Sequence, residues 1–135
     1  MAQSSVKEKI LIVDDNKNIA ELIAEFCEIL GYETRTLNGG KEVLQAVNDF
    51  RPNLITLDLV MPDIPGAHVL ALLKKDSQTS NIPVLIISCV AGLQRQQKDK
   101  NLELSQGILE KPITLQILDK KIKDVLENTA PSCLS

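Results

Sequence analysis

Short apolar runs alternate with stretches of helical spacing along almost the whole chain. The run Lys9-Ile-Leu-Ile-Val13 is continuously apolar after its lysine, which predicts a buried strand. From Ile19 onward, apolar residues recur every three or four positions, as on one face of a helix. Gly31 then suits the position just after a helix end. The inward positions of this helix are predicted to be Ile19, Leu22, Ile23, Phe26 and Leu30.

The same alternation continues to the end of the chain. Further strands are predicted at 32–37, 54–58, 82–88 and 107–110, and further helices at 43–50, 67–75 and 115–126. The first of these strands carries interleaved charges, which is typical of a sheet edge. The polar stretch 94–100 has almost no apolar stripe, so a helix there would be weakly held.

Five repeats of strand and helix predict an α/β fold with one parallel sheet covered on both faces. The expected architecture is a flavodoxin-like (βα)5 three-layer sandwich with strand order 2-1-3-4-5.

Composition narrows the functional classes. The 135 residues suit one domain, and 44% hydrophobic residues are enough for a core. Aromatic residues make up only 2% and the net charge is −3, so stacking platforms and a basic surface for nucleic acid are not expected. The three cysteines, Cys27, Cys89 and Cys133, fit no disulfide or zinc pattern, and together with the lack of a signal or membrane-spanning run they favour the cytoplasm.

Polar side chains follow four of the five predicted strands. Asp14 and Asp15 follow the first, Asp58 the third, Ser88 the fourth and Lys111 the fifth. Parallel strands end at one edge of the sheet, so these groups are expected in one crevice. Three carboxylates facing one lysine favour a hard divalent cation, Mg²⁺ or alternatively Mn²⁺.

An ionised aspartate can also act as a nucleophile toward phosphorus. A phosphoryl group on Asp58 would need its oxygens stabilised, and Mg²⁺, the Lys111 ammonium and the Ser88 hydroxyl supply such contacts. The residue pattern therefore predicts phosphoryl transfer onto Asp58.

Each of these residues also has an ordinary structural reading. Asp14-Asp15 could be a solvated turn with a helix cap, and Ser88 could cap the following helix. Lys111 could be a surface lysine before a helix-starting proline. Their coincidence at the same predicted sheet edge favours the site.

Four motifs resemble the receiver domain of two-component response regulators, in particular the stand-alone chemotaxis-regulator type. They are Ile10-Leu-Ile-Val-Asp14-Asp15-Asn16, Leu57-Asp58-Leu-Val-Met61-Pro62 with Gly66, Ile86-Ile-Ser88, and Lys111-Pro112. The resemblance covers nearly all of residues 9–128. It implies that Asp58 accepts a phosphoryl group from a sensor histidine kinase or a histidine phosphotransfer protein.

The resemblance also implies the metal ligands. Asp15 and Asp58 would bind Mg²⁺ directly, the Val60 backbone carbonyl would be a third ligand, and Asp14 would act through a bound water. Ser88 and Lys111 would contact the phosphoryl oxygens, and the Lys111–Pro112 bond would be cis.

The chain departs from the family pattern at positions linked to signal output. Ile108 stands where the family often has a tyrosine or phenylalanine, Cys89 replaces a small alanine, and Leu104 replaces a glycine. We therefore expect the switch to use the positions of Ser88, Cys89 and Ile108 and a mobile 91–104 segment, without aromatic gating. The resemblance implies that the positions of Val60 and Val90 influence water attack on the acyl phosphate. Apolar side chains there cannot orient the water, which predicts slow self-dephosphorylation.

Three other functions fit the residue pattern less well. A haloacid-dehalogenase-type phosphatase needs a second acid where this chain has Val60. A nucleotide or flavin module lacks its glycine-rich motif here, since Gly39-Gly40-Lys41 follows an edge strand. A non-phosphorylated pseudo-receiver scaffold is disfavoured by the complete set of acids, serine and lysine.

The domain organisation is predicted as an N-terminal tail (1–8), a receiver domain (9–128) and a C-terminal tail (129–135). The initiating Met and polar tails favour a stand-alone receiver over a piece of a longer regulator or hybrid kinase. The expected protein is a signalling phosphoacceptor that does not turn over as an enzyme, monomeric or dimerising on phosphorylation, acting on a downstream protein or a fused output domain.

Overall fold

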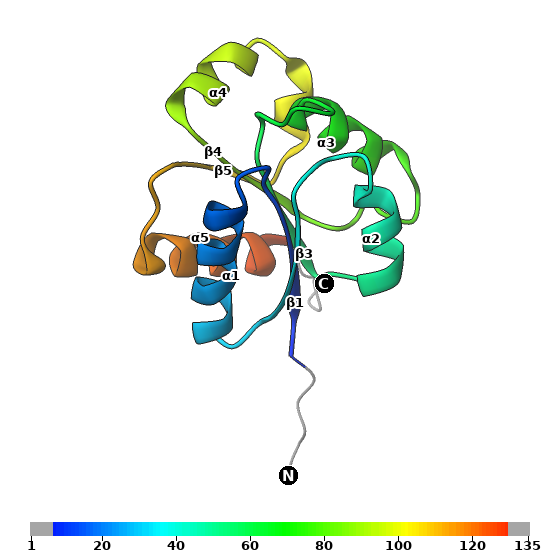
Figure 1. Ribbon diagram of the computed structural model, residues 1–135. Helices are drawn as coiled ribbons and strands as arrows, with labels where there is room; N and C mark the ends of the chain where they lie inside the picture. Colours follow the sequence, from blue (N-terminus) through cyan, green and yellow to red (C-terminus); the bar gives the residue numbers. More distant parts are fainter. Residues whose placement is uncertain (1–6, 130–135) are drawn as a thin grey trace.

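A central sheet of five parallel strands forms the middle layer of the computed structural model, which describes residues 7–129 (Figure 1). The strands lie in the order β2-β1-β3-β4-β5, which confirms the predicted fold and strand order. Their bounds are β1 Lys9–Val13, β2 Glu33–Leu37, β3 Leu54–Leu57, β4 Val84–Ser88 and β5 Gly107–Glu110. The fourth strand begins two residues later than predicted, because Pro83 has no N–H to donate to a sheet ladder.

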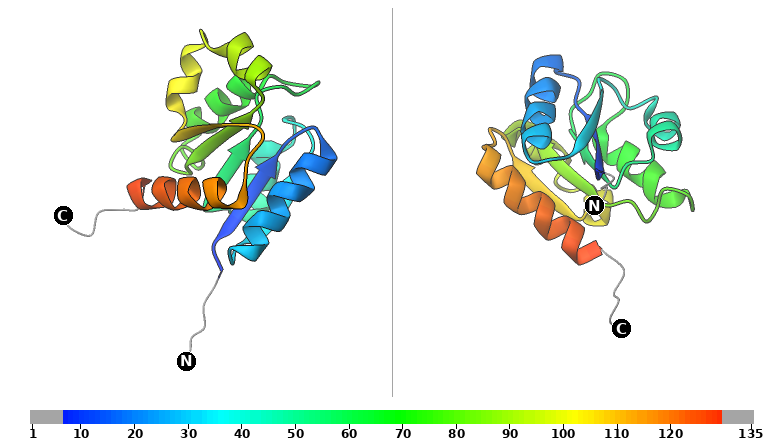
Figure 2. Two further views of the ribbon diagram at one scale, coloured as in Figure 1. Left: turned by 90° about the vertical axis from the view of Figure 1, so that its left-hand side faces the viewer. Right: turned by 90° about the horizontal axis from the view of Figure 1, so that it is seen from below.

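Helices cover both faces of this sheet (Figure 2). Their bounds are α1 Lys17–Ile29, α2 Val43–Phe50, α3 Gly66–Lys75, α4 Val90–Gln96, the 3₁₀ helix η1 Lys100–Leu104, and α5 Leu115–Thr129. Helices α1 and α5 pack on one face, while α2 and α3 pack on the other, where α4 and η1 also contribute half-buried leucines. The last helix extends one residue into the predicted C-terminal tail. In the described part of the chain, no helix has both the length and the apolar character that crossing a membrane requires.

Strand periodicity explains the two cores. Successive side chains of a strand point to opposite faces, so in β1 Ile10 and Ile12 join the core under α1 and α5, while Leu11 and Val13 join the core under α2 and α3. Both faces of the central strands are buried, which is why their sequences are continuously apolar.

The predicted inward face of α1 is wrong at Leu22, which is 41% exposed. The buried positions are Ala20, Ile23 and Cys27. Leu22 lies about 100° around the helix from Ile23 and therefore points to the side of this stripe.

The register brings the predicted site residues to one edge. Val13 of β1 pairs with Leu57 of β3, so the acids that follow these two strands are neighbours. At the other side, Ser88 of β4 pairs with Glu110 of β5, immediately before Lys111.

Candidate functional site

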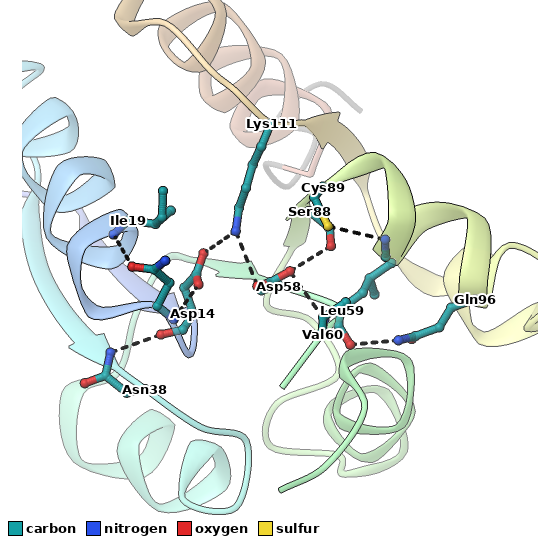
Figure 3. Close-up of polar contacts among 12 residues, drawn as sticks. Asp14, Ile19, Asn38, Asp58, Leu59, Val60, Ser88, Cys89, Gln96 and Lys111 are labelled. Carbon is teal, nitrogen blue, oxygen red and sulfur yellow. Dashed lines mark hydrogen bonds and ion pairs between the residues drawn. The ribbon is translucent and has the colours of Figure 1, made fainter. Parts of the chain in front are cut away.

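Asp58 lies at the centre of this edge, just beyond the end of β3. Its backbone N–H donates to the Val13 carbonyl at 2.9 Å, which continues the strand pairing for one more residue. The side chain is only 5% exposed. Its Oδ1 accepts hydrogen bonds from Ser88 Oγ at 2.7 Å and from the Val60 N–H at 3.4 Å, and its Oδ2 lies 3.3 Å from Lys111 Nζ (Figure 3). Both carboxylate oxygens are therefore oriented by donors from β4, β5 and the loop after β3.

Asp14 is the second buried acid. Its Oδ1 accepts from the Asn16 N–H at 2.9 Å, and its Oδ2 pairs with Lys111 Nζ at 2.7 Å. Its backbone carbonyl accepts from the Asn38 side chain at 3.0 Å, so the β2–α2 loop helps to fix the end of β1. Asp15 is exposed, yet one carboxylate oxygen from each of the three acids lies within 4.8 Å of the others.

Lys111 reaches across the sheet edge from the end of β5. Its N–H donates to the Ser88 carbonyl at 2.9 Å, and the Lys111–Pro112 bond is cis, as the family resemblance implied. In Figure 3 the ammonium points between Asp14 and Asp58.

The pKa shifts of Asp14 and Lys111 follow from the burial of these two side chains and from the excess of acids around them. Burial raises the pKa of Asp14, the nearby charge of Asp58 raises it further, and the hydrogen bond from Lys111 offsets this only in part. Burial by itself lowers the pKa of Lys111, but the bonds to Asp14 and the charge of Asp58 outweigh it, so the net pKa is raised. One ammonium thus remains firmly protonated and still does not neutralise the three acids.

This donor set fits a hard divalent cation. Mg²⁺ prefers oxygen ligands and is usually bound by one or two carboxylates with several retained waters. The exposed Asp15 side chain and the oriented Asp58 oxygens offer such ligands, and the surplus negative charge supplies the attraction. A carboxylate held in this way by neighbouring donors can also act as a nucleophile.

Five of the predicted site residues therefore meet at one edge: Asp14, Asp15, Asp58, Ser88 and Lys111. The backbone of Val60 is also adjacent, through its N–H.

Two of the predicted switch residues, Cys89 and Ile108, are exposed at the surface. Cys89 is exposed and caps α4, where its Sγ accepts from the Gly92 N–H at 3.4 Å. Ile108 is 43% exposed and lines an outer groove of about 500 Å³ together with Val90, Leu93 and Leu102.

Two contributors were missed from the sequence. Asp63 accepts hydrogen bonds from the backbone N–H groups of Gly40, Lys41 and Ile64, which hold its pKa below the usual range and clamp the β2–α2 loop to the β3–α3 loop. Gln96, in the polar stretch 94–100 that has almost no apolar stripe, donates to the Leu59 carbonyl. In the sequence, the Gly39-Gly40 turn is a weak indication of the hydrogen bonds that Asp63 accepts, whereas nothing indicates those of Gln96.

Comparison with known proteins agrees with this geometry. The family model of the response regulator receiver domain matches residues 10–123. The phosphate regulon transcriptional regulatory protein PhoB of Pseudomonas aeruginosa is 32% identical over 127 residues, which cover 93% of this chain and 55% of that protein. The polar-differentiation response regulator DivK of Brucella anthropi is 30% identical over 123 residues, which cover 88% of this chain and 96% of that protein.

A solved structure matches as well. The response regulator protein TrrA of Thermotoga maritima, in complex with Mg(2+)-BeF, aligns with a TM-score of 0.78 and 26% identity over 87% of this chain and 98% of that chain. The chain spans about half the length of several curated relatives, including PhoB, and nearly the whole of DivK. With a family model covering most of its residues and the matching strand-end acids in place, this chain belongs to the family of response regulator receiver domains.

Proposed function

We propose that this protein accepts a phosphoryl group on Asp58 in a Mg²⁺-dependent reaction. One observation carries the proposal: oxygens of Asp14, Asp15 and Asp58 gather within 4.8 Å, while Ser88 and Lys111 hold the two oxygens of Asp58. Residues 9–128 form the receiver domain in this proposal. The protein is a signalling component and not a turnover enzyme.

The proposed reaction is an in-line displacement at phosphorus. An Asp58 oxygen forms the new O–P bond, and the bond from phosphorus to the donor's histidine nitrogen breaks, which returns the nitrogen's electron pair to the imidazole. Asp15, Asp58 and the Val60 carbonyl would hold Mg²⁺, and Asp14 would act through a water. When bound, this ion supplies positive charge to the phosphoryl oxygens.

Ser88 and Lys111 are already placed for the product. The Ser88 hydroxyl donates to Asp58 Oδ1, and the Lys111 ammonium lies beside Oδ2. The same donors can turn to the phosphoryl oxygens once Asp58 carries an acyl phosphate, since a hydroxyl and an ammonium both rotate freely.

The test is labelling with radioactive acetyl phosphate, with and without Mg²⁺. We expect label on the wild-type protein only with the ion, and none on Asp58→Ala. Asp49→Ala, an exposed acid on α2, is the matched control and should label normally. Absence of label on the wild type would favour the pseudo-receiver scaffold instead, and label retained by Asp58→Ala would move the acceptor elsewhere.

The phosphorylated state is proposed to be long-lived, with a lifetime of minutes to hours. Val60 follows Asp58 by two residues and Val90 follows Ser88 by two, and neither side chain can orient a water by hydrogen bonding. Decay of the label in excess Mg²⁺ measures this lifetime, and Val60→Asn should shorten it. Loss of the label within seconds in the wild type would contradict the proposal.

The proposed partners are a sensor histidine kinase or a histidine phosphotransfer protein as donor, and a downstream protein or a fused output domain as receiver of the signal. The signal passes through the face formed by β4, α4, β5 and α5, using Ser88, Cys89 and Ile108, in a cytoplasmic protein that is monomeric or dimerises on phosphorylation. Hydrogen exchange of residues 91–104 with and without beryllofluoride tests the relay. Unchanged exchange there would rule it out.

A further inference from the structure

Gln96 is the last residue of α4, and both ends of its side-chain amide are engaged. Its Nε2 donates to the Leu59 carbonyl at 2.8 Å, and its Oε1 accepts from the Ala67 N–H at 3.2 Å. Figure 3 shows the side chain reaching from α4 to the loop that follows Asp58. The amide therefore spans that loop from its first residue to the first turn of α3.

The bond to Leu59 bears directly on Asp58. The Leu59 carbonyl and the Val60 N–H belong to one peptide unit, which is planar, so fixing one end fixes the other. That Val60 N–H donates to Asp58 Oδ1. A single rigid peptide thus has Gln96 on one side and the proposed phosphoacceptor on the other.

The loop itself is tightly closed. The Gly66 N–H also donates to the Leu59 carbonyl, at 2.9 Å, and a Cβ at Gly66 would overlap the Asp58 backbone carbonyl. A loop with so little freedom passes a change at one end to the other, because it cannot absorb the change by bending.

Helix α4 has few other attachments to the body of the protein. It is seven residues long, Gly92 is its only buried residue, and Leu93 is half-buried. A helix of this length is not stable without tertiary contacts. Two hydrogen bonds from its last residue are therefore a large part of what holds its C-terminal end.

We propose that Gln96 is a positioning residue that fixes the Leu59–Val60 peptide against Asp58 and ties this peptide to helix α4. The inference rests on the proposed function, because it adds how the ion site and the phosphoacceptor are coupled to an outer surface. Leu93 and Gln94 of the same helix, and Gln97 directly after it, line the groove of about 500 Å³, so a change in the tie reaches that groove. Coupling of this kind is reciprocal: what binds at the acids alters α4, and loosening α4 alters binding at the acids.

The test compares Gln96→Met with Gln94→Met. Methionine keeps the length and helix propensity of glutamine but removes both amide hydrogen bonds. Gln94 is an exposed glutamine of the same helix, so it controls for the change of residue type. The first measurement is hydrogen exchange in the metal-free protein. We expect protection of the Ala67 amide and of residues 93–97 to fall roughly 3- to 10-fold in Gln96→Met only, as for the loss of one ordinary hydrogen bond.

The second measurement is Mg²⁺ affinity by titration calorimetry. Gln96→Met should raise the dissociation constant roughly 3- to 10-fold, a modest effect for a group that orients a metal ligand from behind. Mg²⁺ should also increase protection of residues 93–97 in the wild type and not in Gln96→Met. A merely structural glutamine would lower stability without changing the dissociation constant.

The outcomes separate the two proposals. Equal Mg²⁺ affinity and equal exchange in Gln96→Met and wild type would overturn the role of Gln96 while leaving phosphorylation of Asp58 intact. If the wild type binds no Mg²⁺, the proposed function fails, and metal-free exchange alone then decides whether the tie exists. Equal effects from Gln94→Met would also overturn the assignment, because they would trace to the helix and not to the amide.

Discussion

The acids at the sheet edge are expected to be a source of instability in the metal-free protein, and Asp58→Asn tests this. Asp58 is almost fully buried and shares its surroundings with two other acids and one lysine. An asparagine can keep two of the three local hydrogen bonds: its Oδ1 can face Lys111, and its NH₂ can donate to Ser88 Oγ. The substitution therefore removes a charge at the loss of one long hydrogen bond, the one from the Val60 N–H at 3.4 Å.

The magnitude follows from the distances. At an effective dielectric constant of about 20, each acid oxygen within 4.8 Å repels Asp58 by at least about 3.5 kcal/mol. Lys111 at 3.3 Å attracts it by about 5 kcal/mol. The two repulsions exceed the attraction by about 2 kcal/mol, and the exposure of Asp15 to solvent reduces this to about 1 kcal/mol. Asp58→Asn should therefore raise the free energy of unfolding by about 1 kcal/mol, or Tm by about 3–5 °C.

Mg²⁺ should reverse the order of stability. At ten times its dissociation constant, an ion that binds only the native state stabilises it by about 1.4 kcal/mol. The wild type gains this amount and the variant, lacking a ligand, gains little, so the wild type becomes the more stable protein.

Urea unfolding measures the stability of the metal-free and the Mg²⁺-bound protein. Far-ultraviolet circular dichroism follows the transition, since the chain has no tryptophan. Asp124→Asn on α5 removes the same charge at an exposed position and serves as the control. A metal-free Asp58→Asn protein less stable than wild type, or one still stabilised by Mg²⁺, would refute the reasoning.

Three further predictions concern individual groups. Gly66→Ala should destabilise the protein by about 2 kcal/mol or more in urea unfolding, because its Cβ would overlap the Asp58 backbone carbonyl; a neutral effect would mean that the loop can move. The native pKa of Lys111 is raised above its ordinary value of 10.5, so the contribution of this ammonium to stability is fully present below pH 10.5 and is lost as the pH rises through the native pKa. Lys111→Met should therefore show a shallower fall in the free energy of unfolding above pH 10.5. An equally steep fall in the variant and the wild type would contradict this. In a Cys133→Ser background, a thiol reagent at neutral pH should label Cys89, which is exposed, and not Cys27, whose pKa burial raises to about 12; mass spectrometry of the labelled peptides decides.

The fold was predictable because hydrophobic burial dominates it. The three central strands β1, β3 and β4 are buried on both faces and are apolar runs in the sequence, and several of the turns between elements carry glycine or proline. The strand-end acids, Ser88 and Lys111 could also be grouped from the sequence, because parallel strands end at the same edge of a sheet.

What could not be predicted depends on single hydrogen bonds. Gln96 lies in a polar run whose composition is the same whether it faces water or the Leu59 carbonyl. The exposure of Leu22 likewise depends on a small rotation of α1 that packing against α5 and β1 decides. The hydrophobic pattern of a sequence does not determine single hydrogen bonds or small rotations of a helix. These depend on the three-dimensional contacts.

The geometry around α4 bears on how a receiver without the usual aromatic residue can transmit a signal. The first turn of α4 lies directly on the site, since a Cβ at Gly92 would come within 2.6 Å of Ser88 Oγ and 2.7 Å of Val60 Cγ2. The last residue of the helix is tied to the Leu59–Val60 peptide by Gln96. Ser88 and Val60 both donate to Asp58 Oδ1, so both ends of the helix depend on what that single oxygen carries. A phosphoryl group on Asp58 would compete for both donors at once, and apart from these two ends the short helix is attached to the core through the half-buried Leu93. Such a mechanism would not require an aromatic side chain at position 108, where this chain has an isoleucine.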